Sequence, residues 1–461
     1  MRVFESTVYI QRREILKKRL GRGKVLLYGN QEVGVNFKDN WYPFRQDSTL
    51  LYYTGIDIPD VHLMIDIDQN EEVLFGNSLT IDDIVWTGPL PSLQEIAHAA
   101  GISKVSPLKK LTDVVDDTTM YLPPYRSDHT LLLSGILDIP TNEVSAKASL
   151  PLIHAVIQQR NYKDRLEIEE MNQAVAFSYD MHKAVMKASK EGIYEYDLVG
   201  VASEIAYQNH VHFAYPAILT KRGEVLHNHD HSHLISSNDI ILYDGGCESH
   251  KYYAGDITRT FPVNGEWTSL QKDLYDVVYD SFSQCERSLR PGVLFKDVHL
   301  LGSKVIFEGM KSLGFAKGDV DDAVANGAHT LFFQCGLGHM IGLDVHDMEN
   351  LGEHHVGYGE ELKKSKEFGL KSLRLARTLE PGFALTVEPG IYIIPELIEM
   401  RKQESIFHEF INFDRLEKIA DFGGIRLEDN YVITADGYTR LGDHVEMPRT
   451  SEEIEAFMKM E

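Results

Sequence analysis

Acidic side chains stand at the ends of strongly apolar runs in the second half of the 461-residue sequence. Asp244 follows the run IILY and precedes two glycines, and Glu388 follows FALTV and precedes Pro-Gly. Short apolar runs of this kind predict buried β-strands. A carboxylate beside a buried strand must be paired or metal-bound, because an isolated charge is costly to remove from water. The chain is therefore expected to adopt a fold that gathers these strand ends in one cleft.

A third acidic residue adds to this expectation. Asp256 precedes the alternating run ITRTF, which predicts another strand. If the two strands form a hairpin, Asp244 and Asp256 come side by side, and two like charges in contact indicate a shared proton or a metal ion. Taken alone, Asp244 is better explained as a turn-forming residue at a strand end.

Two histidines lie in the glycine-rich and otherwise apolar segment GLGHMIGLDVH, as His339 and His346. A single histidine is usually structural, but this pair indicates one ligand and one proton carrier or substrate contact. Further along, Arg426 and Glu428 share a strand face by the period of two. A surface salt bridge is the alternative for that pair.

The net charge of -24 argues against binding to phosphate backbones or anionic lipid surfaces, so neither nucleic acid nor a membrane is an expected partner. Three scattered cysteines are too few for a disulfide framework and fit a reducing compartment. The first 20 residues predict a helix rather than a signal peptide, and no run approaches the roughly 20 apolar residues that cross a bilayer. A cytoplasmic protein is expected.

The length of the chain predicts two domains, because one core rarely grows to this size. We place the boundary in the polar stretch QQRNYKDRLE, which gives domains 1–160 and 161–461. Strands are expected at KVLLYG, LLYYTGI and VHLMIDID in the first domain. Long amphipathic helices are expected from about 165 to Gly192 and from about 270 to 289 in the second.

Together these segments resemble the M24 metallopeptidase family, in its proline-selective branch of aminopeptidase P and prolidase. The resemblance implies an α+β fold, with a pita-bread catalytic domain preceded by an α/β creatinase-type domain. The N-terminal half carries matching segments at FRQDS (44–48), YTG (53–55) and WTGP (86–89). The family holds two metal ions with two aspartates, one histidine and two glutamates, which here match Asp244, Asp256, His339, Glu388 and Glu428.

By the family's geometry, Asp256 and Glu428 would bridge the two ions, Asp244 would chelate one, and His339 with Glu388 would complete the other. An oxygen-rich set of this kind suits Mn²⁺ first, with Co²⁺ or Zn²⁺ as alternatives. A water between two such ions has its pKa lowered toward ~7 and is the expected nucleophile. Glu388 is the expected proton shuttle, with a role as ligand alone as the alternative.

The resemblance also implies a substrate and its contacts. The substrate is a small peptide with proline in the second position, and the protein is expected to be a homodimer. His227 resembles the substrate-side histidine, His346 resembles the histidine that steadies the tetrahedral intermediate, and Arg426 resembles the arginine beside the last ligand. Tyr215 is a candidate for the substrate pocket. Structural hydrogen bonds are the alternative for these side chains.

Arg374 resembles the prolidase arginine that grips the free carboxylate of a dipeptide. This favours an Xaa-Pro dipeptidase slightly over an aminopeptidase P acting on longer peptides. A surface arginine on a helix is the alternative for this residue.

The chain departs from the family pattern in two places. Cys335 stands where a histidine is usual, and the spacing of 256 minus 244, or 12, is one residue longer than expected, so a bulge or wider turn must absorb it. The first departure is the feature that favours a weakly active or inactive binding protein of the same fold. A creatinase-like amidinohydrolase is disfavoured because all five ligand positions are filled.

Overall fold

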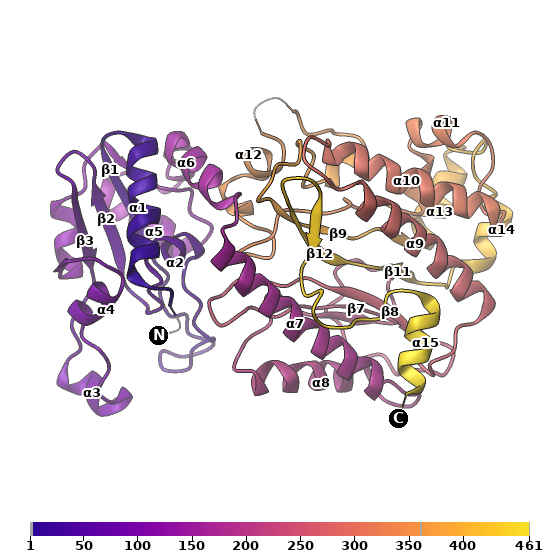
Figure 1. The fold of residues 1–461 in the computed structure, drawn as a ribbon, viewed down its shortest axis with the longest axis horizontal. Helices are drawn as coiled ribbons and strands as arrows, with labels where there is room; N and C mark the ends of the chain where they lie inside the picture. Colours follow the sequence, from indigo (N-terminus) through magenta and orange to yellow (C-terminus); the bar gives the residue numbers. More distant parts are fainter. Residues whose placement is uncertain (1–2, 360–361, 461) are drawn as a thin grey trace. The chain divides into compact units, whose positions relative to one another are not determined.

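The computed structural model describes residues 3–359 and 362–460 and divides the chain into two compact units (Figure 1). The first unit contains Met1–Arg160 and Met348–Gly352, and the second contains Asn161–Asp347 and Glu353–Glu461. Each unit has helices packed on β-sheet. No helix in the described part of the chain combines the length and the apolar character needed to span a bilayer.

The first unit is built on a five-stranded sheet with the order β4-β3-β2-β1-β5. The three central strands are antiparallel, and the two edge strands run parallel to their neighbours. Its strands are β1 (Lys24–Tyr28), β2 (His62–Asp66), β3 (Glu71–Phe75), β4 (Lys104–Ser106) and β5 (Thr119–Met120). Its helices are α1 (Ser6–Leu20), α2 (Ser48–Thr54), α3 (Ile81–Thr87), α4 (Leu93–Ala99), α5 (Ser127–Leu137) and α6 (Leu150–Arg160), with 3₁₀ turns η1 (Leu108–Asp113) and η2 (Ser145–Lys147).

The segment LLYYTGI is helical, so the predicted strand there is wrong. It forms α2, whose N-terminus is capped by Asp47, because this carboxylate accepts hydrogen bonds from the backbone N–H groups of Thr49 and Leu50. All seven residues of α2 are buried, so the run is apolar on every side and its periodicity could not separate helix from strand. The N-terminal cap by Asp47 therefore favours a helix over a strand in this segment.

Several helices of the second unit begin at capping side chains. Asp164 caps α7 (Arg165–Ala188) by accepting hydrogen bonds from the backbone N–H groups of Leu166 and Glu167, and the carboxylate of Glu167 accepts one from Asp164. Such a capping box stabilises a helix by about 0.5–2 kcal/mol. The predicted apolar face is buried as expected: Met171, Ala174, Val175, Ser178, Met181 and Val185 are all 0% exposed.

The other predicted long helix is α9 (Ser269–Ser288). The remaining α-helices of this unit are α8 (Glu195–Gln208), α10 (Phe295–Ser312), α11 (Val320–Ala325), α12 (Glu353–Gly357), α13 (Pro395–Gln403), α14 (Phe413–Leu416) and α15 (Ser451–Lys459). The 3₁₀ turns are η3 (Ala328–Leu331), η4 (Glu349–Leu351, in the segment of the first unit), η5 (Leu370–Ser372) and η6 (Glu417–Ile419).

The sheets of the second unit are small and antiparallel. Their orders are β6-β7-β8, β13-β12-β9 and β10-β11. The strands are β6 (Ile218–Thr220), β7 (Ile240–Asp244), β8 (Thr258–Pro262), β9 (Ala384–Val387), β10 (Gly390–Tyr392), β11 (Gly424–Arg426), β12 (Asp429–Ile433) and β13 (Tyr438–Arg440).

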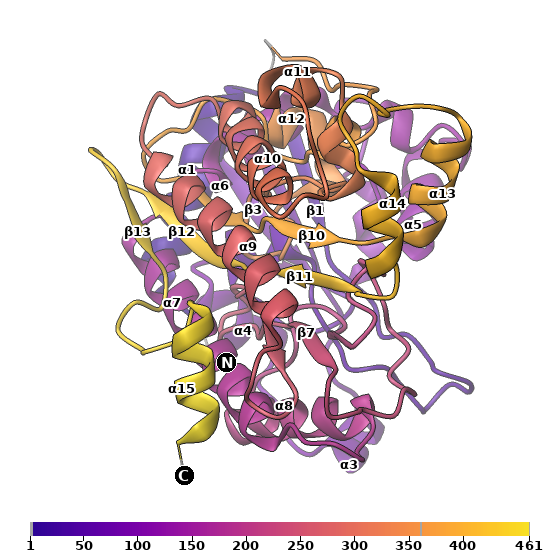
Figure 2. The same cartoon turned by 90° about the vertical axis from the view of Figure 1, so that its right-hand side faces the viewer.

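Two isolated backbone bridges lie beside residues of the predicted site. Thr258 pairs with Glu428, and Met340 pairs with Leu385. Among these helices α7 packs on α8 and α9 packs on α10. Helix α9 also lies against β9, β10 and β11, and it crosses β10 and β11 in Figure 2. The strand ends in the middle of the unit are therefore shielded by helices and held in register by the bridges.

Candidate metal centre and pocket

All ten residues singled out in the sequence line one pocket of about 520 Å³ in the second unit. They are Tyr215, His227, Asp244, Asp256, His339, His346, Arg374, Glu388, Arg426 and Glu428. Hydrophobic side chains from the β6 region and from the segment after His339 complete the wall. The pocket thus combines an acidic floor with imidazole, guanidinium and apolar sides.

The first two carboxylates are brought together by the hairpin of β7 and β8. Asp244 is the last residue of β7 and pairs with Thr258, while Asp256 lies two residues before that partner. The hydroxyl of Tyr215 donates to Asp244 Oδ1 at 2.6 Å and also lies in hydrogen-bond contact with Asp256 Oδ1. In the connection between the two strands, Tyr252 adopts a positive φ of 69°.

His339 presents one ring nitrogen to the carboxylates. Its Nδ1 lies 3.1 Å from the carbonyl oxygen of Met340, and its Nε2 lies 3.2 Å from Asp256 Oδ2 and 3.5 Å from Glu388 Oε1. An Nδ1–H that donates to a carbonyl leaves the lone pair on Nε2, which is the usual arrangement of a metal-binding histidine. Glu388 follows β9 directly, and its side chain is 19% exposed.

The last pair of predicted residues flanks the break between β11 and β12. Arg426 Nη2 donates to Asp244 Oδ2 at 2.5 Å, and its Nη1 donates to the hydroxyl of Tyr392 at 3.0 Å. Glu428 Oε2 accepts from the hydroxyl of Thr258 at 2.7 Å. Glu428 lies between β11 and β12 rather than on one strand with Arg426, and the two side chains meet at Thr258, because Arg426 Nε also donates to the Thr258 hydroxyl at 3.1 Å.

Burial dominates the electrostatics of the four carboxyl groups. It raises the pKa of Asp244, Asp256 and Glu428, and Asp256 raises the pKa of Glu428 further. Burial raises the pKa of Glu388 to about 8, with added repulsion from Asp256 and Asp244. Arg426 opposes these shifts but supplies a single positive charge. One guanidinium cannot balance four carboxylates, so the site favours protons or cations.

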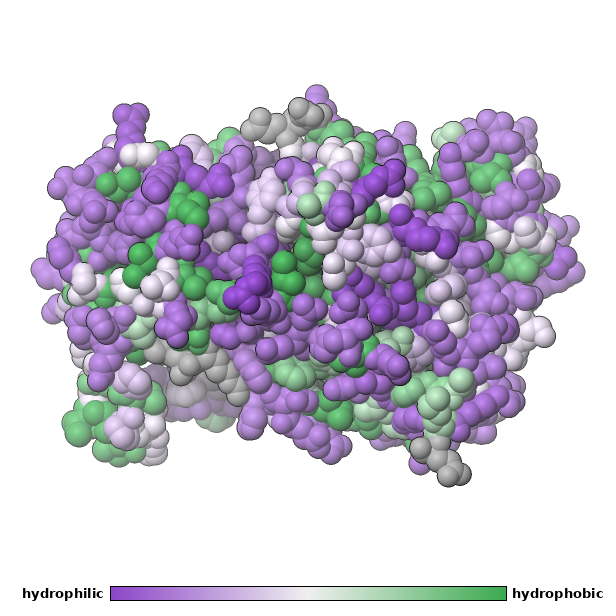
Figure 3. Space-filling model, viewed as in Figure 1, coloured by the Kyte–Doolittle hydropathy of each residue, from purple (hydrophilic) through white to green (hydrophobic). Residues whose placement is uncertain are grey.

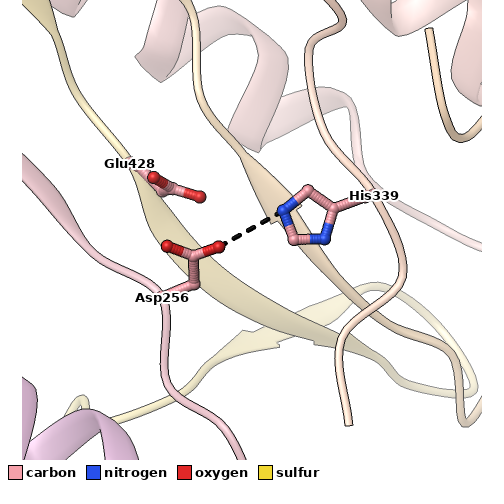
Figure 4. Close-up of side chains that lie close together, drawn as sticks. All are labelled: Asp256, His339 and Glu428. Atoms are coloured by element: carbon pink, nitrogen blue, oxygen red, sulfur yellow. Dashed lines mark ion pairs between the residues drawn. The ribbon is translucent and has the colours of Figure 1, made fainter. Parts of the chain in front are cut away.

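The geometry suits a hard divalent cation. Asp256, His339 and Glu428 each offer a ligand atom, and these atoms lie within 4.8 Å of one another (Figure 4). Glu428 Oε1 is buried and has no hydrogen-bond partner among the described residues. A buried polar atom without a partner in a native site indicates a missing ion or water. Carboxylate oxygens with one imidazole fit a divalent metal at this position.

The remaining predicted residues surround this cluster. The ring of His346 lies 4.3 Å from that of His339 at a steep angle. His227 is exposed in the loop between β6 and β7, and partial desolvation by its neighbours lowers its pKa. Arg374 Nη1 lies 3.5 Å from Glu353 Oε2. Imidazole and guanidinium groups are therefore present on the walls of the pocket, around its acidic floor.

Several neighbours were missed in the sequence. The hydroxyls of Thr258 and Thr386 donate to Glu428 and Glu388, and the positions of the threonines two residues from Asp256 and Glu388 were the available signal. A buried ion pair of 3.0 Å between Lys163 and Asp347 holds the chain next to His346.

Cys335, the departure noted above, lies on the pocket wall with its Sγ 3.7 Å from the hydroxyl of Tyr392. Burial raises the pKa of its thiol to about 12, so the group is neutral at physiological pH. The thiol therefore adds no charge to the pocket.

Two family models match this chain. Residues 169–435 match metallopeptidase family M24, and residues 9–121 match the aminopeptidase P N-terminal domain. The chain belongs to metallopeptidase family M24. The resemblance read from the acidic segments is confirmed, as is the fold class, an α+β M24 catalytic domain preceded by an aminopeptidase P-type N-terminal domain.

Relatives of this M24 protein carry two kinds of name. The chain is 31% identical over 453 residues to the Xaa-Pro dipeptidase of Homo sapiens, covering 94% of this chain and 88% of that protein. It is 32% identical over 428 residues to a probable Xaa-Pro aminopeptidase of Botryotinia fuckeliana, covering 92% and 90%.

Solved structures also match along the whole chain. The aminopeptidase PepP of Pseudomonas aeruginosa has a TM-score of 0.81 at 27% identity, covering 99% of each chain. A zinc-substituted aminopeptidase P of E. coli in complex with product has a TM-score of 0.79 at 27% identity, covering 99% of this chain and 98% of that one. The family uses divalent metal, and the names do not separate the dipeptidase from the aminopeptidase.

Proposed function

We propose that this M24 protein is a metal-dependent exopeptidase that hydrolyses the peptide bond between an N-terminal residue and proline. The observation that carries the proposal is the convergence of four carboxylates and one imidazole on the floor of a single pocket. The names of the relatives support the choice of substrate, since both kinds act on Xaa-Pro bonds. We assign residues 1–160 to the N-terminal domain and 161–461 to the catalytic domain.

The proposed ligands of two divalent ions are Asp244, Asp256, His339, Glu388 and Glu428. Four negative charges and a neutral imidazole balance two doubly charged cations, and the predominance of oxygen favours Mn²⁺ over Co²⁺ or Zn²⁺. When bound, such ions act as Lewis acids that polarise a carbonyl group and lower the pKa of a water molecule. The unpartnered Oε1 of Glu428 supports this assignment.

The remaining roles fall to groups of the chain itself. Glu388 reaches the pocket from the end of β9 and would carry a proton toward the leaving nitrogen. His346, against His339, would donate to the oxygen that becomes negative in the tetrahedral intermediate. His227 would contact the peptide from the opposite wall. Arg426 donates to Asp244 and holds this carboxylate in place. The hydroxyl of Tyr215 faces the two aspartates, so Tyr215 would orient their carboxylates as well as contact the substrate.

The function is tested with full-length protein that has been stripped by a chelator and reloaded with Mn²⁺. An Xaa-Pro dipeptide should be cleaved only by the reloaded protein, and the matching Xaa-Ala dipeptide should be cleaved by neither. Equal cleavage of both peptides would remove proline selectivity from the proposal.

We place a dipeptidase slightly ahead of an aminopeptidase because of Arg374. Its guanidinium lies on the pocket wall, and Glu353 lies 3.5 Å from it. Loss of a charge-assisted hydrogen bond to a substrate carboxylate costs about 1.5–3 kcal/mol, or roughly 10- to 100-fold in kcat/KM. Arg374→Ala should therefore lower kcat/KM by this factor on an Xaa-Pro dipeptide and by less than about threefold on an Xaa-Pro-Yaa tripeptide.

The control for this prediction is Arg377→Ala. Arg377 pairs with Glu380 three residues along and is not among the residues that line the pocket. Its loss should leave both substrates unaffected. Equal losses on dipeptide and tripeptide in Arg374→Ala would favour the aminopeptidase instead.

We further propose a homodimer, as expected for the family. The first unit supports this proposal because α3 has no buried residue, and its apolar side chains are unusually exposed: Ile81 and Val85 at 72% and Trp86 at 87% (Figure 3). An exposed apolar cluster of this kind is typical of an association surface.

The free thiols of all three cysteines support a reducing compartment, and we place the protein in the cytoplasm.

Light scattering at micromolar concentration should give twice the mass of 52.3 kDa. Val85→Ser combined with Trp86→Ser should shift the protein toward the monomer, because it removes apolar area from the association surface. Leu131→Ser is the control, because Leu131 is also apolar and 64% exposed but lies in α5 rather than in α3. A monomeric wild-type protein would contradict the proposal.

A further inference from the structure

Two threonine hydroxyls sit behind the acidic cluster in matching arrangements. Thr258 begins β8 and Thr386 lies within β9, and both are 0% exposed. Each hydroxyl touches one glutamate of the cluster and one further group of the site. Neither residue belongs to the proposed ligands.

The proton of the Thr258 hydroxyl has one available direction. Arg426 Nε lies 3.1 Å from the hydroxyl oxygen, and a guanidinium can only donate, so the oxygen accepts there. The single O–H must then point to Glu428 Oε2, at 2.7 Å. This bond occupies Oε2 and leaves Oε1 as the oxygen without a partner.

The Thr386 hydroxyl follows the same logic. The backbone N–H of His339 donates to it at 3.1 Å, and a backbone N–H can only donate. The hydroxyl proton is therefore directed at Glu388 Oε1, at 3.2 Å. One hydroxyl thus connects the backbone of the histidine to the carboxylate of the glutamate, and the backbone N–H of Thr386 returns a bond to the His339 carbonyl at 3.0 Å.

We propose that Thr258 and Thr386 are positioning residues that orient different glutamates and thereby control the two metal ions separately. The inference rests on the proposed ligand set. Thr258 orients Glu428, the proposed bridge between both ions, whereas Thr386 orients Glu388 and His339, which are proposed for one ion only. Loss of the first hydroxyl should weaken both ions, and loss of the second should weaken one.

The strand offers a matched control in Thr260. This residue lies two positions after Thr258 in β8 and is also 0% exposed. Its hydroxyl donates to the backbone carbonyl of Arg426 and accepts from the backbone N–H of the same residue, both at 3.1 Å. Thr260→Val therefore removes a hydroxyl that is as buried as that of Thr258 and lies in the same strand, but that contacts no carboxylate of the site.

The experiment is a titration of the full-length chelated protein with Mn²⁺, followed by calorimetry and by metal analysis after gel filtration. Removal of a group that supports a ligand typically costs 10- to 100-fold in metal affinity. Thr258→Val should bind both ions about 10- to 100-fold more weakly, and Thr386→Val should retain one ion at wild-type affinity and lose the other. Thr258→Ser and Thr386→Ser should restore wild-type binding, and Thr260→Val should match the wild type.

The inference is overturned if both valine variants bind two ions with wild-type affinity, or if Thr260→Val loses metal as they do. If a valine variant unfolds below the assay temperature, the alanine variant takes its place, and the same outcomes apply. A wild-type chain that fails to bind two ions would overturn the proposed function itself, and the two failures are therefore distinguishable.

Discussion

Glu428→Gln is expected to abolish measurable binding of the metal pair and to lower kcat/KM for an Xaa-Pro dipeptide by at least about 100-fold. This factor is the upper end of the loss seen when only a group that supports a ligand is removed, and Glu428 is itself a proposed ligand. The amide keeps the size of the side chain but removes the charge. The same substitution should stabilise the metal-free protein against heat, because burial and then repulsion by Asp256 and Glu388 disfavour the charged form of Glu428.

The prediction for Glu428→Gln is specific because metal binding should fall while the thermal stability of the metal-free protein should rise. Glu170→Gln is the control, since Glu170 is a buried carboxylate of the same unit, 5% exposed, that pairs with Lys251 and does not line the pocket. Its neutralisation should lower thermal stability and leave metal content unchanged. Thermal unfolding after chelation and metal analysis by mass spectrometry provide both readouts. A metal-free Glu428→Gln protein that is less stable than the wild type would contradict the account of repulsion.

Arg426→Met is expected to destabilise the metal-free protein by about 3–5 kcal/mol, the usual cost of removing one partner from a buried ion pair. The pair with Asp244 is nearly enclosed, with side chains 4% and 12% exposed. The loss should be smaller when Mn²⁺ is present, because bound cations then compensate the charge of Asp244. Urea unfolding with and without metal measures both values.

Arg440→Met serves as the comparison. Arg440 lies 3.8 Å from Asp429, is 20% exposed, and shares this partner with Arg259 and Arg449. Its removal should cost no more than about 1 kcal/mol, because Arg440 is partly exposed and the buried Asp429 keeps its contacts with Arg259 and Arg449. If Arg426→Met were no more destabilising than this, Arg426 would not be the charge that holds Asp244.

Local patterns in the sequence were sufficient for the elements that carry the cluster. The run IILY predicted β7 with Asp244 at its end, and the amphipathic stretch from about 270 predicted α9. Both patterns are short-range, since burial of one strand or one helix face repeats with a fixed period. The grouping of the five predicted ligand positions came from resemblance to a family, because strand ends far apart in sequence are joined only in the folded chain, by the pairing of β9 with β12 and by isolated bridges.

Other features depend on tertiary contacts, which the hydrophobic periodicity of the sequence does not predict. The polar stretch at the predicted domain boundary contains Lys163, whose side chain is 1% exposed because Asp347, 184 residues later, neutralises it. The direction of the Tyr215 hydroxyl toward the two aspartates is likewise a tertiary fact. Sequence indicates which chemical groups are present, whereas the partners of a buried polar group follow from the assembled fold.

The central claim is that this enclosed group of carboxylates functions only with divalent cations among them. The most direct measurement is turnover of an Xaa-Pro dipeptide by exhaustively chelated protein, titrated with Mn²⁺ under metal-free buffer conditions. The account predicts no turnover after chelation and full recovery at two equivalents of Mn²⁺ per chain. Undiminished turnover by protein shown to contain no metal would contradict it.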